Sequence, residues 1–204
     1  AEIQAALDKL LASKDVTPAM HAALGWHFPV IKIIAPDWAK ANQDVIFSLA
    51  VPKLWEAAWD GYITFNPVYA DLLPEFRKHY EKAIETMPER ETAKRMDKES
   101  VNHLAQHLLI AKVHGLSFGD GPDLLMAFYE KAPLAQREHA AWFLGRRCLE
   151  EDTQKPRFWI ALKPVIEARI AWAEATKDMA VIGSEIAALA HALEFAPGPF
   201  SEVS

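Results

Sequence analysis

The fold is decided by the stretch from Arg137 to Trp172, which reads REHAAWFLGRRCLEEDTQKPRFWIALKPVIEARIAW. Apolar residues recur every three or four positions on both sides of a polar break at about residues 150–155. This period is typical of amphipathic helices. The stretch therefore predicts two helices joined by a short loop, and the rest of the chain repeats the same pattern.

Proline, glycine and short polar side chains mark the ends of further helices. Thr17-Pro18 predicts a helix start, because Thr can cap the helix and Pro at its first position lacks only a donor that would be unpaired anyway. Asn66-Pro67 has the same form, and Gly115 is a typical helix end. Other starts are predicted at Pro36, Pro52, Asp123, Pro133 and Pro156, kinks at Pro29, Pro74 and Pro164, and a last helix over residues 178–195.

These signals predict an all-α fold of roughly nine or ten helices in antiparallel pairs. Ala57-Ala58-Trp59 and Ala140-Ala141-Trp142 each precede a glycine and a proline-interrupted helix. This similarity indicates HEAT-like or armadillo-like repeats, with an irregular helical bundle as the alternative. We expect a single domain over residues 1–204, or two lobes joined near 88–98, where the chain is highly charged.

The composition excludes several classes of function. The chain has 204 residues, with 51% hydrophobic and 25% charged residues, which is typical of globular proteins. The net charge of -6 and the mixing of both signs predict no nucleic-acid partner. Cys148 is the only cysteine, which excludes a disulfide within the chain and a Cys-based zinc site and favours a reducing, cytoplasmic compartment.

Targeting signals are not recognisable in the sequence. No apolar run approaches about 18 residues, and no signal peptide is recognised, so we expect no membrane association. The chain begins at Ala1, which predicts a processed protein or an excised domain. Gly-rich phosphate loops and serine-hydrolase or zinc-protease motifs are also absent from the sequence, so we expect no catalysis and no cofactor.

Histidines on one helix form a candidate metal site. His103 and His107 lie one turn apart, and Glu99 lies one turn before His103, so the three could share an ion. His114 is about 10 Å further along the axis, too far to join them. The alternative interpretation is a polar face that meets solvent or a partner.

Arginines and a tryptophan are the candidate binding residues. Arg146 and Arg147, with Arg157 across the loop, could hold a phosphate or an acidic partner, although Glu150, Glu151 and Asp152 could neutralise them. Arg169 falls in the middle of an apolar helix face, which predicts a structural ion pair or a side chain that reaches solvent, or else a ligand contact.

Trp59 is the candidate aromatic anchor for a partner. The chain has seven tryptophans, and we expect one or two of them to be exposed.

Two runs carry a resemblance to a known class of proteins. Trp55-Glu56-Ala57-Ala58-Trp59-Asp60-Gly61-Tyr62 with Leu72-Leu73-Pro74, and Phe143-Leu144-Gly145-Arg146 with Phe158-Trp159 and Glu167-Ala168-Arg169, resemble the helical C-terminal region of large bacterial defence proteins. Those proteins carry an N-terminal SIR2-like or STAND-type nucleotidase part. The resemblance extends from about Pro36 onward and implies a non-catalytic sensor or scaffold region that takes part in antiviral defence.

Three hypotheses for the function follow. The first is a helical interaction or sensor module whose partners are other protein domains or a protein ligand. The second is a small metal-binding protein or enzyme that uses His103 and His107. The third is a helical domain that binds a small apolar ligand between kinked helices. The oligomeric state does not follow from the sequence.

Overall fold

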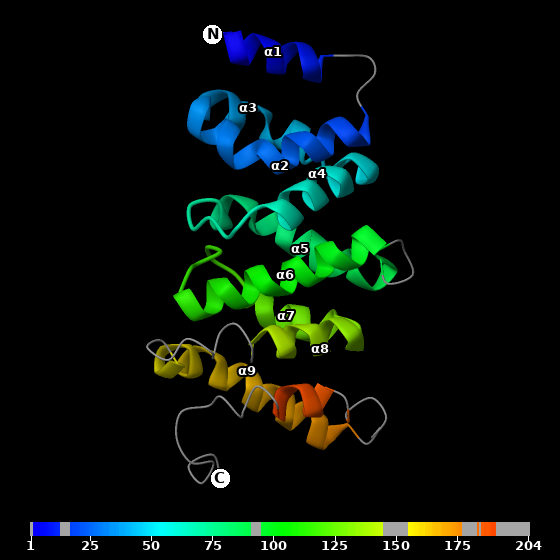
Figure 1. The fold of residues 1–204 in the computed structure, drawn as a ribbon, viewed down its shortest axis with the longest axis vertical. Coiled ribbons are helices and arrows are strands. Elements are labelled where there is room, and N and C mark those ends of the chain that lie inside the picture. Colours follow the sequence, from blue (N-terminus) through cyan, green and yellow to red (C-terminus); the bar gives the residue numbers. More distant parts are fainter. Residues whose placement is uncertain are drawn as a thin grey trace. The chain divides into compact units, whose positions relative to one another are not determined.

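The computed structural model describes residues 2–12, 17–90, 95–144, 155–176, 183 and 185–190, without the side chains of 88–90, 95–98 and 155–158. These residues confirm the all-α prediction, since helices and short connections make up the described chain and none of it forms a strand (Figure 1). The chain divides into two compact units. Unit 1 comprises Ala1–Pro67 and Arg95–Ser100, and unit 2 comprises Val68–Lys94 and Val101–Ser204.

Unit 1 contains four complete helices whose starts follow the proline signals. Thr17 caps its helix as predicted, with Oγ1 accepting from the N–H of Met20 at 3.3 Å. Pro29 lies inside that helix without ending it. The helices are α1 (Glu2–Leu11), α2 (Pro18–Ile34), α3 (Pro36–Ile46) and α4 (Pro52–Phe65).

Glycines allow α2 and α4 to cross at backbone contact (Figure 1). A methyl group added at Gly25 would collide with the carbonyl of Ala58, and one added at Gly61 would collide with the carbonyl of Ala22. Each helix therefore presents a glycine to the other helix's backbone. Larger residues at either position would force the two helices apart.

Aromatic rings fill the core of unit 1 around this crossing. Phe47 meets both Phe28 and Tyr62 edge-on, with ring centroids 5.3 and 6.2 Å apart. His21, buried on α2, donates from Nδ1 to the carbonyl of Ile46 at 2.7 Å and so ties α2 to the end of α3. Trp38 Nε1 donates to Asp8 Oδ1 at 2.6 Å and so ties α3 to α1.

Unit 2 contains the remaining labelled helices, except for residues 95–100 of α6, which belong to unit 1. Asp123 caps α7 as predicted, accepting from the N–H groups of Leu125 and Met126 at 2.9 and 3.3 Å, and Gly115 ends α6 with a φ of 65°. The helices are α5 (Leu73–Arg90), α6 (Arg95–His114), α7 (Leu124–Lys131), α8 (Leu134–Phe143) and α9 (Lys155–Ala175). Residues 185–190 are also helical, and the rest of the helix predicted over 178–195 lies outside the described residues, apart from Gly183.

The helix start predicted at Asn66-Pro67 and the kink predicted at Pro74 were wrong. Asn66 ends α4 instead of starting a helix, because its side-chain amide donates to the carbonyls of Tyr62 and Trp26. The next helix begins only at Leu73, so Pro74 stands in its first turn, where it costs no backbone hydrogen bond. Helices also extend into the charged segment near 88–98, as far as Arg90 and again from Arg95.

Candidate binding surface

Helix α2 is apolar on all sides. Between Pro18 and Ile34 its only lysine, arginine, aspartate or glutamate is Lys32. Leu24, Phe28 and Ile31 lie on the buried face, which packs in the core of unit 1. Apolar residues all round a helix are typical of one that is covered on every side.

The opposite face of α2 is exposed. Ile33 is 78% exposed, and Trp26, Val30 and Ile34 are each about half exposed, at 46%, 52% and 53%. At 100° per residue these four fall within an arc of about 100°. Phe65 at the end of α4, also half exposed, adjoins them through its contact with Trp26. We call this surface the outer face of α2: Ala23, Trp26, His27, Val30, Ile33, Ile34 and Phe65.

The size of this surface sets it apart from scattered exposed side chains. At these exposures the five large apolar residues present on the order of 500 Å² of apolar area, since one large side chain offers about 150–250 Å². The largest apolar patch on a typical monomer covers about 300–600 Å² and is often functional. The outer face of α2 therefore qualifies as a candidate binding surface.

Trp26 is held in place on this surface. Its ring stacks on His27, with centroids 4.8 Å apart and planes 15° apart, and it contacts the ring of Phe65 at 4.8 Å. The carbonyl of Trp26 accepts from Asn66 Nδ2 at 2.9 Å. An aromatic side chain fixed before binding loses little conformational entropy when a partner covers it.

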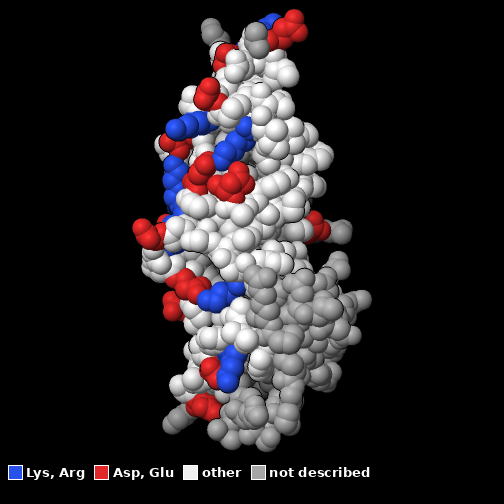
Figure 2. Space-filling view, turned by 90° about the vertical axis from the view of Figure 1, so that its left-hand side faces the viewer, with Lys and Arg blue, Asp and Glu red and all other residues white. Residues whose placement is uncertain are grey.

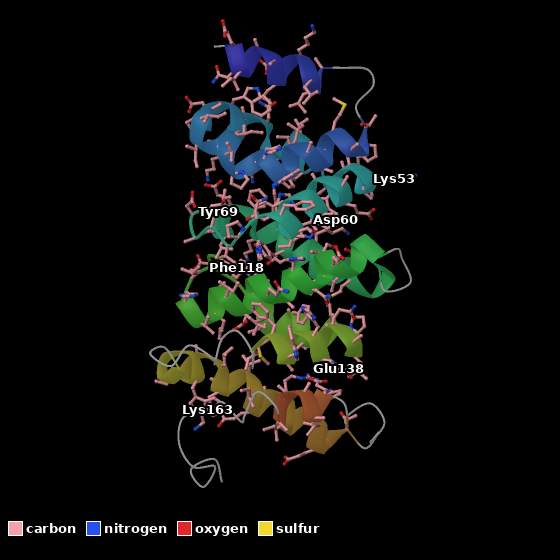
Figure 3. The ribbon with its side chains drawn as sticks, viewed as in Figure 1. Lys53, Asp60, Tyr69, Phe118, Glu138 and Lys163 are labelled. Atoms are coloured by element: carbon pink, nitrogen blue, oxygen red, sulfur yellow. The ribbon has the colours of Figure 1, made fainter. Side chains whose placement is uncertain are left out.

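A hollow of about 280 Å³ lies in unit 2 beside the loop after α6. Phe118, labelled in Figure 3, stands in that loop and packs edge-on against Tyr80. Arg77 donates to the carbonyls of Gly119 at 3.4 Å and Pro122 at 2.7 Å and so holds the loop against α5. The volume lies just below the range of about 300–1,000 Å³ typical of small-ligand sites.

The charges in this hollow are balanced. Arg77 pairs with Glu81 at 2.8 Å, and Lys112 pairs with Asp123 at 2.7 Å. Partial burial acts to raise the pKa of Asp123, but hydrogen bonds from Lys112 and from the backbone of Met126 and Leu125 together lower it below 3.8. The carboxylate is therefore ionised as helix cap and ion-pair partner, and the two cations already have partners.

Two buried arginines share one carboxylate elsewhere in unit 2. Arg169 donates to Glu185 from Nε at 2.7 Å and from Nη2 at 3.1 Å, and Arg137 Nε lies 3.0 Å from Glu185 Oε2 without an aligned hydrogen bond. Trp172 faces both guanidinium groups, with Arg169 Cζ 4.1 Å and Arg137 Cζ 4.9 Å from its ring centroid. The carboxylate partner predicted for a buried Arg169 is thus present.

Burial lowers the pKa of Arg137, while the neighbouring Glu185 raises it and Arg169 lowers it. Arginine stays protonated in proteins even so. The three side chains therefore form a charged cluster with two cations to one anion, stabilised by the flat faces of aromatic rings. A ligand role for Arg169 stays a prediction.

The predicted metal ligands are not gathered into one site. His107 is buried, and its Nδ1 lies 2.8 Å from the hydroxyl of Tyr80. His139 Nε2 accepts from Gln106 at 3.2 Å, and its pKa is lowered by burial and by the nearby His103. Among the described residues, Glu99 included, no group of three His, Cys, Asp or Glu side chains could hold a metal ion.

One of the other predicted binding residues lies in the core, and the remaining three lie wholly or partly outside the described residues. Trp59 is 1% exposed and stacks in the core on Trp55, with ring centroids 6.1 Å apart and planes 8° apart. Arg146 and Arg147, and the side chain of Arg157, lie outside the described residues. Among the tryptophans whose burial is described, Trp26 and Trp142 are exposed. This confirms the prediction that one or two tryptophans are exposed.

Sequence reasoning missed the outer face of α2. The sequence did carry an indication of this surface. A helix with apolar residues on all sides and a single lysine is expected to be buried on two opposite faces. The sequence could not show that the helices described in the structure cover only one of these two faces. That fact depends on which helices pack together.

Comparisons with known protein families, with curated proteins and with solved structures give no match for this chain. Within the described part of the chain, no helix has both the length and the apolar character needed to cross a bilayer.

Proposed function

We propose that the chain is a non-catalytic interaction module that docks another protein on the outer face of α2. The observation that carries this proposal is the row of large apolar side chains, 46–78% exposed, on a helix whose other face is buried. Burying apolar area stabilises a complex by about 25 cal/mol per Å² before the costs of association are counted.

The shape and charge of the outer face favour a protein over other ligands. A helix of 17 residues is about 25 Å long and convex, whereas small-molecule sites are concave. Nucleic acid needs clustered cations, and Lys32 is the only one that α2 carries. Figure 2 agrees with this, since the lysine and arginine side chains that it shows lie among aspartate and glutamate, mainly along the left of the view.

The resemblance described above extends the proposal to a biological setting. If it holds, the chain is the helical sensor or scaffold region of a larger bacterial defence-type protein and acts in the cytoplasm. The genomic neighbourhood and the full-length parent sequence test this extension. A parent without any nucleotidase or NAD-hydrolysing part would contradict it.

Photo-crosslinking tests the docking proposal. A benzophenone amino acid is placed at position 30, on the outer face, and in a control at position 160, where Ile160 is 73% exposed on α9. In cells that make the chain, we expect position 30 to give a discrete crosslinked protein product that Ile33→Glu abolishes. Position 160 should give no such product. Absence of any protein product from position 30 would overturn the proposal.

A further inference from the structure

We propose that the partner on the outer face of α2 is a second copy of this chain, with the two α2 helices packed antiparallel about a twofold axis near Val30. This inference rests on the proposed function, because it names the partner of the same surface. Three properties of the surface lead to it: its spacing, its lack of charge and its area.

The spacing is that of a helix-pairing seam. Ala23, Trp26, Val30 and Ile33 follow one another at intervals of three, four and three residues. This is the heptad spacing with which one helix packs its side chains between those of another. A partner helix can therefore lie along the whole exposed length of α2.

The surface is suited to meeting itself. In a twofold interface the same patch is used by both copies, so every residue meets its symmetry equivalent or a fixed counterpart. An axis at Val30 brings Trp26 of one copy over Ile34 of the other, since each lies four residues from Val30, and so pairs a large flat ring with a smaller aliphatic side chain. Lys32 is about 200° round the helix from Val30, so no like charges meet at the seam.

The area agrees with what a stable dimer needs. Standard interfaces bury about 800 Å² on each partner, with an apolar centre and a polar rim. The outer face supplies on the order of 500 Å² of apolar centre, and polar residues beside it can supply the rim. Trp26, fixed by His27 and Phe65, has the character of a central anchor residue.

Sedimentation velocity on the full chain tests the inference. We expect wild type to sediment with twice the 22.9 kDa mass of one chain and to dissociate only on dilution. Ile33→Glu should be monomeric with an unchanged circular dichroism spectrum. Ile160→Glu is the matched control, since Ile33 and Ile160 are 78% and 73% exposed, and it should remain dimeric.

A disulfide test checks the register. On a Cys148→Ser background, Val30→Cys should form a covalent dimer rapidly under mild oxidation, while Ile160→Cys should not. Three outcomes would each overturn the inference. They are a wild type that is monomeric at all concentrations, a dimer that persists in Ile33→Glu, and equal disulfide formation at positions 30 and 160. If wild type is monomeric but position 30 photo-crosslinks to a different protein, the second-copy inference fails and the proposed function stands. If neither occurs, both fail.

Discussion

Glu185 is the residue on which the buried charge cluster depends. Among the described residues it is the carboxylate bonded to Arg169; it also lies against Arg137, and its side chain is 2% exposed. Glu185→Gln leaves two buried guanidinium groups without that anion, so we expect the free energy of unfolding to fall by about 3–5 kcal/mol. Arg169→Met should cost less, because Arg137 stays beside the carboxylate. Denaturant unfolding followed by circular dichroism measures both, and a larger loss for Arg169→Met would contradict this assignment.

His139 should make the fold sensitive to mild acid. Its pKa lies below the usual 6.5 because burial and His103 disfavour the charged imidazole. A lowered pKa in the folded state gives stability that is present above pH 6.5 and is lost as the pH falls through the lowered value. We expect the melting temperature to drop more for wild type than for His139→Gln between about pH 7 and about pH 5.5. His114→Gln, at an exposed position, is the control, and equal drops for wild type and His139→Gln would refute the role of His139.

At the scale of helices, the α2–α4 crossing should tolerate no side chain at its glycines. Gly25→Ala places a methyl group against the backbone carbonyl of Ala58, which cannot move without shifting α4. We expect a loss of about 2 kcal/mol or more in the free energy of unfolding. Gly183→Ala is the control, because nothing lies within 4 Å of the added methyl group, and it should be neutral or slightly stabilising. Similar effects of the two substitutions on denaturant unfolding would show that the crossing is looser than described.

Helix boundaries with a local cause could be predicted from the sequence, and boundaries with a distant cause could not. Thr17 and Asp123 cap with their own side chains, and Gly115 ends its helix through its own φ. Asn66 was misread because its amide donates to Trp26, 40 residues away, as well as to Tyr62. The sequence predicted that a buried Arg169 would pair with a carboxylate. It could not identify that carboxylate as Glu185, because the pairing depends on tertiary packing.

At the scale of the whole molecule, the proposed function rests on one apolar surface that is exposed in the described part of the chain. The sequence predicted an interaction module, but it pointed to Trp59, which lies in the core, and not to Trp26, which is exposed. Both tryptophans stand among apolar neighbours in helices, so local pattern alone does not separate them. The HEAT-like or armadillo-like repeat and the division into lobes near 88–98 stay predictions.

The most direct test of the central claim is whether a protein covers the outer face of α2 in the cell. On a Cys148→Ser background, a thiol introduced at position 33 is labelled with a maleimide in intact cells and in dilute purified protein, with a thiol at position 160 as reference. Both native residues are isoleucines with similar exposure, so the two sites report under matched conditions. The account predicts that labelling at position 33 is slowed at least about tenfold in cells, equivalent to about 1.4 kcal/mol of protection, while labelling at position 160 is unchanged. Equal labelling of position 33 in cells and in dilute solution would contradict it.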